Sequence, residues 1–572
     1  MKPTLRRREV PDVPLLADAA LHPVLARVYA ARGVQTRDQL DLRLSRLLTP
    51  SALGGLDRAC ALLREAIAGD ARILVVGDFD CDGATGAAVA YRGLRLLGAR
   101  RVDVRVPNRA VHGYGLTPAL VADIVADGVP DLLITVDSGI ACVPGVRAAK
   151  QAGCRVLVTD HHLPPEVLPE ADAIVNPNLR GDGFPSKALA GVGVMFYLLL
   201  ALRASMREAG AFAGRSEPDL SCLLDLVALG TVADLVALDH NNRVLVAAGL
   251  KRIRAGLASA GIAALIEVSK RRAGELSATD LGFSIGPRVN AAGRLEDMQI
   301  GVACLCCDDP AQAREWAARL DVINAERRGL QQDMVDQAEL AVARLHLDGD
   351  LPPVLCLQEP DWHAGVVGLV ASKIKERVHR PVFAFAAAGE GSSELKASAR
   401  SVAGVHLRDL IAELDMREPG LIQRFGGHAM AAGLSLDAAD FGRFRTAMTA
   451  LAAERIDPGV LAAEIWSDGE LTAGDIDLAL AEALRDGGPW GQAFPEPQFD
   501  GRFEIASARV VGERHVAMKL QDHSGRILDA IAFGAFDGRL PTGRIRAVFQ
   551  PIVDDWRGER RAKLLLRHFE PD

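Results

Sequence analysis

The sequence predicts an α/β protein built from a parallel-sheet domain, a second α/β domain reached through a long helix, and a C-terminal β-barrel. Three features predict this: short apolar runs alternating with helical stretches, one long uninterrupted helical pattern, and five alternating runs behind a Gly- and Pro-rich segment. The chain has 572 residues, 49% of them hydrophobic. At roughly 100–200 residues per domain, this length accommodates three or four domains.

The first domain is predicted from short runs rich in Val, Ile and Leu, separated by Ala-rich helical stretches. Continuous apolar strands that alternate with helices indicate a parallel sheet buried on both faces. Residues 188–260 are then expected to be mostly helical, and residues 1–50 to form an irregular leader with helical stretches. The expected strands are residues 72–78, 102–107, 131–137, 155–160 and 171–176.

The long helix is predicted over residues 308–345, which contain a single Gly and no Pro after Pro310. At about 1.5 Å per residue such a helix could reach about 50 Å, enough to bridge two domains. A second α/β pattern follows, with apolar strands at 354–358 and 381–386.

The C-terminal part changes character near residues 486–501, which are dense in Gly and Pro. Alternating apolar and polar runs with turns between them fit a small all-β barrel. The expected barrel strands are residues 502–511, 515–522, 526–533, 544–553 and 561–569.

Composition excludes several classes of protein. The longest charge-free apolar run, residues 188–202, is too short to cross a bilayer, and the basic start is not followed by the apolar segment of a secretory signal. The nine Cys form no paired zinc pattern, although Cys304 and Cys307 have CxxC spacing, so we expect reduced thiols and a cytoplasmic protein. A net charge of −8 argues against a protein that coats nucleic acid, but not against an enzyme with one basic channel.

Acidic and imidazole side chains follow three of the predicted strands. In an open parallel sheet, ligands bind outside the carboxyl ends of the strands, so these side chains should meet at one edge. Like charges gathered there require a cation, and oxygen ligands with one or two imidazoles suit Mn²⁺ or Mg²⁺ better than a thiolate zinc site. The side chains are Asp78, Asp80 and Asp82 after the first strand, Asp137 after the third, and Asp160, His161 and His162 after the fourth.

These carboxylates suffice for two metals if one Asp bridges, and Asp234 is a further candidate because it interrupts an apolar stretch. Two metals roughly 3.5–4 Å apart can activate a water for phosphoester hydrolysis. A lone DxD after a strand is more often a helix N-cap or a turn, and adjacent His residues are more often structural. Their coincidence at three strand ends favours metal binding. Cys81, inside the acidic loop, is expected to be a small buried filler.

The motifs DFDCDG, VDSG, DHH and VADLVAL, in this order, resemble those of the DHH phosphoesterase superfamily. Segments 285–295, 362–373, 397–401 and 426–433 resemble the second, DHHA1, domain of that superfamily and its junction. The connecting helix, the GPWGQAFPEPQF element and the terminal barrel resemble its single-strand-specific exonucleases. Phe79 and Cys81 stand where those relatives commonly have Tyr and Ala, which affects local packing and supplies no ligand.

The resemblance implies a division into a leader (1–50), a DHH catalytic domain (51–307), a connecting helix (308–345), a DHHA1 domain (346–460) and an OB-like domain (461–572). It also implies the metal ligands. Asp78 would be either a ligand or a carboxylate that supports a ligand, and Asp137 is the favoured residue to bridge the two metals. Successive side chains on an extended segment point apart, so His162 can instead contact the scissile phosphate. The implied ligands are Asp80, Asp82, Asp137, His161 and Asp234.

Further residues are candidates for contacts to DNA. Tyr114 could stack a base or belong to the core, and the small residues around His428 could cradle a phosphate or form a packing turn. Basic residues of the barrel, interleaved with aromatics such as Phe533, Phe549 and Trp556, suit a strand-binding platform or a solvated surface. The candidates outside the barrel are Arg109, Tyr114, Arg288, Asn290, His363, Ser398, Arg400, Gly426, Gly427 and His428.

By resemblance, we expect a 5′→3′ exonuclease that hydrolyses single-stranded DNA to 5′-mononucleotides with two Mn²⁺ or Mg²⁺. It would act in recombination and mismatch repair beside a helicase and the single-strand-binding protein, with no membrane partner. One alternative is a DHH phosphodiesterase acting on short oligonucleotides, cyclic dinucleotides or pyrophosphate. A second is a DNA-binding scaffold without catalysis.

Overall fold

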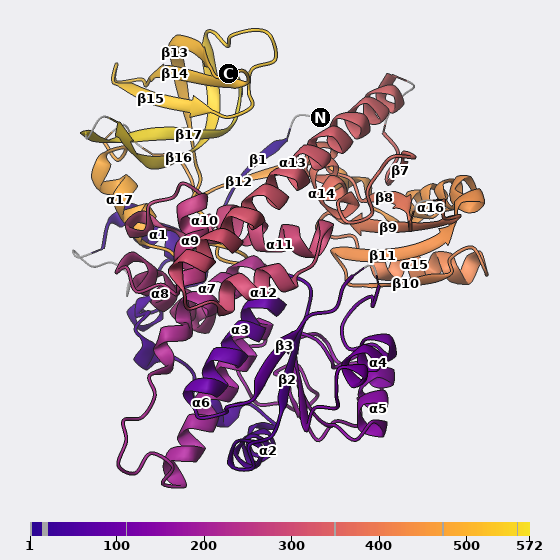
Figure 1. Cartoon of the computed structure of the whole chain (residues 1–572). Coiled ribbons are helices and arrows are strands. Elements are labelled where there is room, and N and C mark those ends of the chain that lie inside the picture. Colours follow the sequence, from indigo (N-terminus) through magenta and orange to yellow (C-terminus); the bar gives the residue numbers. More distant parts are fainter. Residues whose placement is uncertain are drawn as a thin grey trace. The chain divides into compact units, whose positions relative to one another are not determined.

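The computed structural model describes residues 3–13, 21–109, 111–347, 351–389, 391–471, 474–556 and 559–572 (Figure 1). The chain divides into two compact units. The larger unit comprises Arg7–Asp321 and Trp466–Asp572, and the smaller comprises Val322–Ile465 with the first six residues.

The larger unit is built around the expected parallel sheet. All strands of this sheet are parallel, in the order β3–β2–β4–β5–β6, and every residue of β2 and β4 is buried. Burial on both faces explains why these strands are continuous runs of Val, Ile and Leu. The strands are β2 (Ile73–Gly77), β3 (Val102–Arg105), β4 (Leu132–Val136), β5 (Arg155–Thr159) and β6 (Ala173–Val175).

Helices cover both faces of this sheet (Figure 1). On one face, α4 (Pro118–Ala126) and α5 (Val143–Gln151) close an apolar core over β2, β4 and β5. On the other, α3 packs against β2 and against α6 and α7. Apart from α4 and α5, the helices of this part of the larger unit are α2 (Leu56–Ala68), α3 (Cys81–Leu96), α6 (Gly191–Glu208), α7 (Leu224–Ala233), α8 (His240–Arg254), α9 (Ala260–Val268), α10 (Ala278–Asp280), α11 (Gly286–Leu295) and α12 (Gln299–Cys306).

The expected C-terminal barrel is present and closed. Its strand order is β13–β14–β15–β17–β16, with β13 pairing β16 to close the ring and only β15 and β17 parallel. Phe549 is fully buried inside it, which corrects its expected place on a binding surface, whereas Phe533 is 61% exposed. Arg557 and the side chain of Trp556 lie outside the described residues. The strands are β13 (Phe499–Val511), β14 (His515–Gln521), β15 (Ile527–Ala532), β16 (Arg544–Trp556) and β17 (Glu559–Pro571).

The segment before the barrel is held to the N-terminal region by stacked rings and cations. Trp490 and Phe494 stack with ring centroids 5.2 Å apart, and Arg243 lies 3.9 Å from the centroid of Phe494. Arg32 lies 5.4 Å from the ring of Trp490, and Tyr29 of α1 (Pro23–Ala30) stacks on it at 5.9 Å. The leader therefore has a structural role, because it packs on the linker between α17 (Leu478–Asp486) and the barrel.

The smaller unit contains a mixed sheet in the order β10–β11–β9–β8–β7, in which only β7 and β8 are parallel. Phe383, Phe385 and Phe444 form the centre of its core, with edge-to-face contacts between their rings. Its elements are β7 (Leu355–Gln358), α14 (Val367–Val378), β8 (Val382–Ala387), β9 (Glu394–Arg400), α15 (Leu407–Arg417), β10 (Arg424–Gly427), β11 (Ala431–Asp437) and α16 (Phe441–Arg455).

The long helix is α13, Pro310–Leu347, and it connects the two units along the chain. A short ribbon of β1 (Thr4–Arg7) and β12 (Glu464–Ser467) lies where the chain passes back to the larger unit. Among the helices of the described ranges, none is both long and apolar enough to span a membrane.

Replacing the buried Trp490 tests the linker stack. Trp490→Ala removes a ring that is 8% exposed and whose Nε1 donates to the Leu484 carbonyl at 2.8 Å. A change of this kind costs about 3–5 kcal/mol, so thermal unfolding should begin at a clearly lower temperature. Trp466→Ala is the matched control, because Trp466 also carries an arginine, Arg8, over its ring but is 43% exposed. Equal losses for the two variants would contradict a structural role for the stack.

Candidate metal centre

The carboxyl ends of β2, β4 and β5 bring the predicted acidic and imidazole side chains together, and the C-terminal end of α7 adds Asp234. Three sets of ligand atoms form, each with its atoms within 4.8 Å of one another. The sets are Asp78, Asp80 and Asp137; Asp82, His161 and Asp234; and Asp137, His161 and His162.

The loop after β2 places three carboxylates through local backbone geometry. Asp80 is the N-cap of α3, and its Oδ1 accepts from the amides of Asp82 and Gly83 at 2.9 and 3.0 Å. The cap and the metal interpretations of this motif are therefore compatible, because a carboxylate has two oxygens. The carboxylate of Asp82 instead lies at the start of α6, where its oxygens accept from the amides of Gly191 and Val192 at 2.7 and 2.9 Å.

Asp137 follows β4 in the left-handed backbone region, with φ of 62°. This conformation is uncommon for residues other than glycine and clusters at functional sites. A methyl group on Gly191 would lie 2.5 Å from the Cβ of Asp137, so glycine is required where α6 begins beside this carboxylate. The strained residue and the glycine together direct the Asp137 side chain into the cluster.

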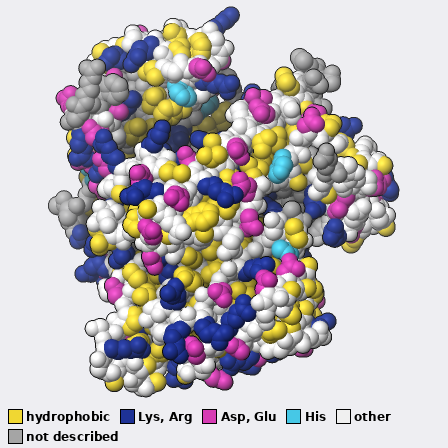
Figure 2. Space-filling model, in the orientation of Figure 1, with side chains coloured by type: hydrophobic (Ala, Val, Ile, Leu, Met, Phe, Trp, Pro, Cys, Tyr) yellow, Lys and Arg dark blue, Asp and Glu magenta, His cyan; other side chains and the backbone are white. Residues whose placement is uncertain are grey.

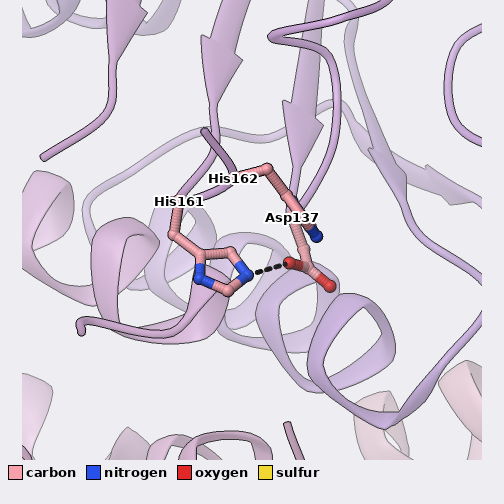
Figure 3. A group of neighbouring side chains, drawn as sticks. All are labelled: Asp137, His161 and His162. Atoms are coloured by element: carbon pink, nitrogen blue, oxygen red, sulfur yellow. Dashed lines mark ion pairs between the residues drawn. The ribbon is translucent and has the colours of Figure 1, made fainter. Parts of the chain in front are cut away.

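The two histidines have different surroundings. The ring of His161 is directed at Asp137, with Nε2 3.1 Å from Oδ1, and lies 3.5 Å from Asp234 Oδ2 (Figure 3). His162 turns its Nδ1 to Asp160 Oδ1 at 2.8 Å. Burial, the largest single effect, lowers the pKa of His162, but the hydrogen bond with Asp160 and the negative charges of Asp160, Asp78 and Asp80 together raise it.

Asp160 and two asparagines position this pair. The sequence predicts Asp160 at the acidic edge but not its role in orienting the histidines, and it predicts no role for the asparagines. Asp160 accepts from the amides of His161 and His162 as well as from the His162 ring. Asn178 donates to the carbonyl of His161 at 2.6 Å, and Asn176 donates to that of His162 at 2.9 Å. The available signal was the polar VNPN segment at the end of the fifth strand, in the same position along the sheet as the other motifs.

Burial and mutual repulsion dominate the electrostatics of the cluster. Burial first, and then the charge of Asp80, raise the pKa of Asp82 to about 7. The pKa values of Asp78, Asp137 and Asp234 are also raised well above the usual range, again mainly by burial and then by neighbouring carboxylates. A cation among them would relieve both effects, because it replaces lost hydration and neutralises charge.

The donors suit a divalent cation. Asp78 Oδ1 is buried and accepts no hydrogen bond from the described residues. Buried polar atoms without a partner are costly, so an oxygen of this kind indicates a missing ligand. Carboxylate oxygens with imidazole nitrogen fit Mn²⁺ or Mg²⁺.

Three of the four DNA-contact candidates of the larger unit contact the acidic loop after β2. The Arg109 guanidinium lies 4.6 Å from the centroid of Phe79, and Tyr114 meets Phe79 edge-on at 5.9 Å. Tyr114 is 47% exposed, so it is not a core residue. The other two candidates, Asn290 and Arg288, hydrogen-bond to other residues of the chain. Asn290 Oδ1 accepts from the Cys81 amide at 2.8 Å. Arg288 Nε donates to Asp321 at 2.8 Å.

In the smaller unit, Ser398 and Arg400 of β9 meet the first turn of α14. A methyl group on Gly368 would lie 3.1 Å from Arg400 Nη2 and 3.4 Å from Ser398 Oγ. A helix N-terminus beside an arginine and a hydroxyl suits an anion. His363 precedes this helix, is exposed, and accepts from the Gly365 amide at 3.1 Å.

The Gly426–Gly427–His428 stretch belongs to a hairpin between β10 and β11 rather than to a helix–strand turn. Gly427 has φ of 134°, which only glycine adopts readily. The His428 amide donates to the Ala431 carbonyl at 2.8 Å, so it is not available to cradle a phosphate. Gly426 has open space where a side chain would lie.

Comparison with known proteins agrees with this architecture. Residues 72–231 match the DHH family N-terminal domain, 351–454 the DHHA1 domain, and 467–568 the RecJ OB domain. The chain is 50% identical to the single-stranded-DNA-specific exonuclease RecJ of Dickeya dadantii, over 99% of both chains. RecJ from Thermus thermophilus, crystallised with Mn²⁺, is 31% identical with a TM-score of 0.81, covering 100% of this chain and 80% of that one. The same protein crystallised with Mg²⁺ is 30% identical with a TM-score of 0.75, covering 100% and 79%. This chain belongs to the RecJ family of single-stranded-DNA-specific exonucleases.

Proposed function

We propose that this protein degrades single-stranded DNA from the 5′ end, hydrolysing phosphodiester bonds to release 5′-mononucleotides with two Mn²⁺ or Mg²⁺. The observation that carries this is the group of buried carboxylates and His161 at the carboxyl edge of the parallel sheet. Relatives of this family are single-stranded-DNA-specific exonucleases, and one has been crystallised with each metal.

The two cations would be held by the two sets that share no residue. Asp78, Asp80 and Asp137 form one, and Asp82, His161 and Asp234 form the other. Asp137 lies 3.1 Å from His161 of the second set, which supports it as the bridge. A pair of bound divalent cations supplies an activated water and stabilises the leaving oxygen.

His162 is proposed to act on the substrate rather than on a metal. Its Nδ1 is held by Asp160, which leaves Nε2 as the atom that can face the scissile phosphate. The pKa of His162 is raised because the Asp160 hydrogen bond and the charges of Asp160, Asp78 and Asp80 together exceed the effect of burial, and this favours a protonated ring that donates to a phosphate oxygen.

DNA contacts are proposed in each unit separately. In the larger unit, Arg109 would bind a phosphate and Tyr114 would stack a base; Arg288 and Asn290 would approach the same strand. In the smaller unit, the start of α14 with Ser398 and Arg400 would bind a terminal phosphate, together with His363, the hairpin residues Gly426 and Gly427, and the ring rather than the amide of His428.

The barrel is proposed to bind the strand farther from the cut. Its visible face mixes Lys and Arg with acidic and hydrophobic side chains rather than forming a uniformly basic surface (Figure 2). Phe533 is exposed, and the ring of His515 meets it edge-on at 5.1 Å. Exposed rings among cations are typical of sequence-independent single-strand binding.

We further propose the domain limits stated above, a cytoplasmic location, and work in recombination and mismatch repair beside a helicase and the single-strand-binding protein. These follow from the family resemblance. The matched family domains fall inside the proposed limits of the catalytic, DHHA1 and OB-like domains.

The direct test of the activity uses purified protein, Mn²⁺ and a single-stranded DNA labelled at either end. Labelled mononucleotide should appear at once from the 5′ label and late from the 3′ label, with duplex DNA and RNA resistant. Cleavage restricted to oligomers of a few nucleotides would favour a small-substrate phosphodiesterase. Binding without metal-dependent cleavage would favour a scaffold.

Asp137→Asn should abolish hydrolysis while DNA binding persists. Because the change also removes one charge from a repelling cluster, the metal-free variant should melt no lower than the wild type. The stabilisation by Mn²⁺, about 2.7 kcal/mol for one site at a hundredfold excess over Kd in the wild type, should be reduced or lost. The control is Asp57→Asn on the exposed face of α2, which should change neither quantity. Retained cleavage by the Asp137 variant would refute the assignment.

Phe533→Ser should weaken binding of a long single strand and leave hydrolysis of a dinucleotide unchanged. Loss of one stacked base is worth about 1–3 kcal/mol, measurable by fluorescence anisotropy. Leu540→Ser, another exposed apolar side chain of the barrel region at 42% exposure, serves as the control. If both variants bind like the wild type, the barrel does not use this ring.

A further inference from the structure

Phe283 is an exposed aromatic side chain that the roles described above do not use. It is 77% exposed, and no other Phe, Tyr or Trp in the described part of the chain is as accessible. A single exposed apolar residue is unremarkable by itself. The backbone and the neighbours of Phe283 give it significance.

Phe283 is the middle residue of a π-helical turn, Leu281–Ile285, that leads into α11. Such turns are rare and frequently occur at functional sites. Leu281 and Ile285 are both buried, so they anchor the turn in the core. Phe283 lies about half a turn from them and is held facing solvent.

The C-terminal end of the segment formed by residues 279–286 packs against residues that adjoin the metal ligands in the sequence. A methyl group on Gly286 would lie 3.2 Å from Ala233 Cβ and 3.9 Å from Cys81 Sγ. Ala233 immediately precedes Asp234, and Cys81 lies between Asp80 and Asp82. Phe283 is three residues from this contact, about 4.5 Å along a helix axis.

The N-terminal end of the segment is connected by hydrogen bonds to strand β16 of the barrel, which belongs to the same compact unit. The Thr279 hydroxyl donates to Glu496, and Glu496 accepts from Gln550 of β16 at 3.2 Å. Arg272, just before the segment, donates to Asp555 of β16 at 3.2 Å. The segment therefore connects the metal centre with the barrel, and Phe283 projects from its middle.

We propose that Phe283 stacks on a base of the single strand where the strand runs between the metal centre and the barrel. The inference rests on the proposed function, and it adds a binding residue to it. An aromatic face accepts any base, so the contact would be independent of sequence. Leu235, 65% exposed and directly after Asp234, would add apolar contact on the metal side.

The test compares wild type with Phe283→Ala and Phe283→Trp on a 5′-phosphorylated 20-nucleotide strand with Mn²⁺. Phe283→Ala should raise KM by roughly 5- to 100-fold, as expected for one lost stacking contact, with kcat unchanged. Phe283→Trp should restore the wild-type KM. The control is Phe212→Ala, because Phe212 follows the far end of α6, about 27 Å along that helix from the turn that holds Asp82.

Abasic substitutions separate stacking from a structural effect. In the wild type, removing the base at one position near the 5′ end should raise KM as much as Phe283→Ala does, and the variant should be insensitive at that position. Equal sensitivity of variant and wild type at every position, or an unchanged KM for Phe283→Ala, would overturn the inference while leaving the activity intact. A wild type that does not cleave the strand would instead overturn the proposed function and this contact with it.

Discussion

Repulsion among buried carboxylates is the constraint on which the rest of the site depends. Asp78, Asp82, Asp137 and Asp234 all have raised pKa values, because burial removes their hydration and their neighbours carry the same charge. A folded protein keeps such a group only when a cation or a proton neutralises it. The cluster is therefore best explained as a binding site for cations, because without them its buried charges would destabilise the folded protein.

The fold meets this constraint with backbone groups and small residues. Helix N-termini supply amides to Asp80 and Asp82, so part of each charge is compensated without a cation. Gly191 allows α6 to begin against Asp137, and the left-handed backbone of Asp137 turns its carboxylate into the cluster. These features orient the ligands before any cation binds, which lowers the cost of forming the site.

Much of the fold and of the metal cluster could be predicted from the sequence, because strand ends carry their chemistry in order along the chain. The continuous apolar strands located the sheet, and the sheet's parallel topology required that Asp78, Asp137 and His161 meet at one edge. The positions that the sequence left open depend on tertiary contacts. Asp160 and Asn176 stand at strand ends like the other motifs, but their bonds to the backbone groups of the histidines and to the His162 ring depend on the folded chain.

The same limit explains the aromatic residues. Phe549 and Phe533 both lie in alternating barrel segments, yet one fills the barrel and the other faces solvent. Phe549 continues the inward-facing alternation of Ile545 and Ala547 in β16, whereas Phe533 directly follows the end of β15, next to the buried Ala532. Phe283 gave no sequence signal, since a π-helical turn is indistinguishable from an α-helix by periodicity. Its exposure follows from the burial of Leu281 and Ile285, which only the folded structure shows.

The proposed hydrolysis depends on two neighbouring cations held by the carboxylate cluster. Electron paramagnetic resonance of the protein titrated with Mn²⁺ measures this directly. We expect two bound ions per chain with the spin coupling of a bridged pair in the wild type, and a single uncoupled ion or none in Asp137→Asn. One uncoupled ion in the wild type, or a coupled pair that survives the loss of Asp137, would rule out a two-cation centre bridged by Asp137.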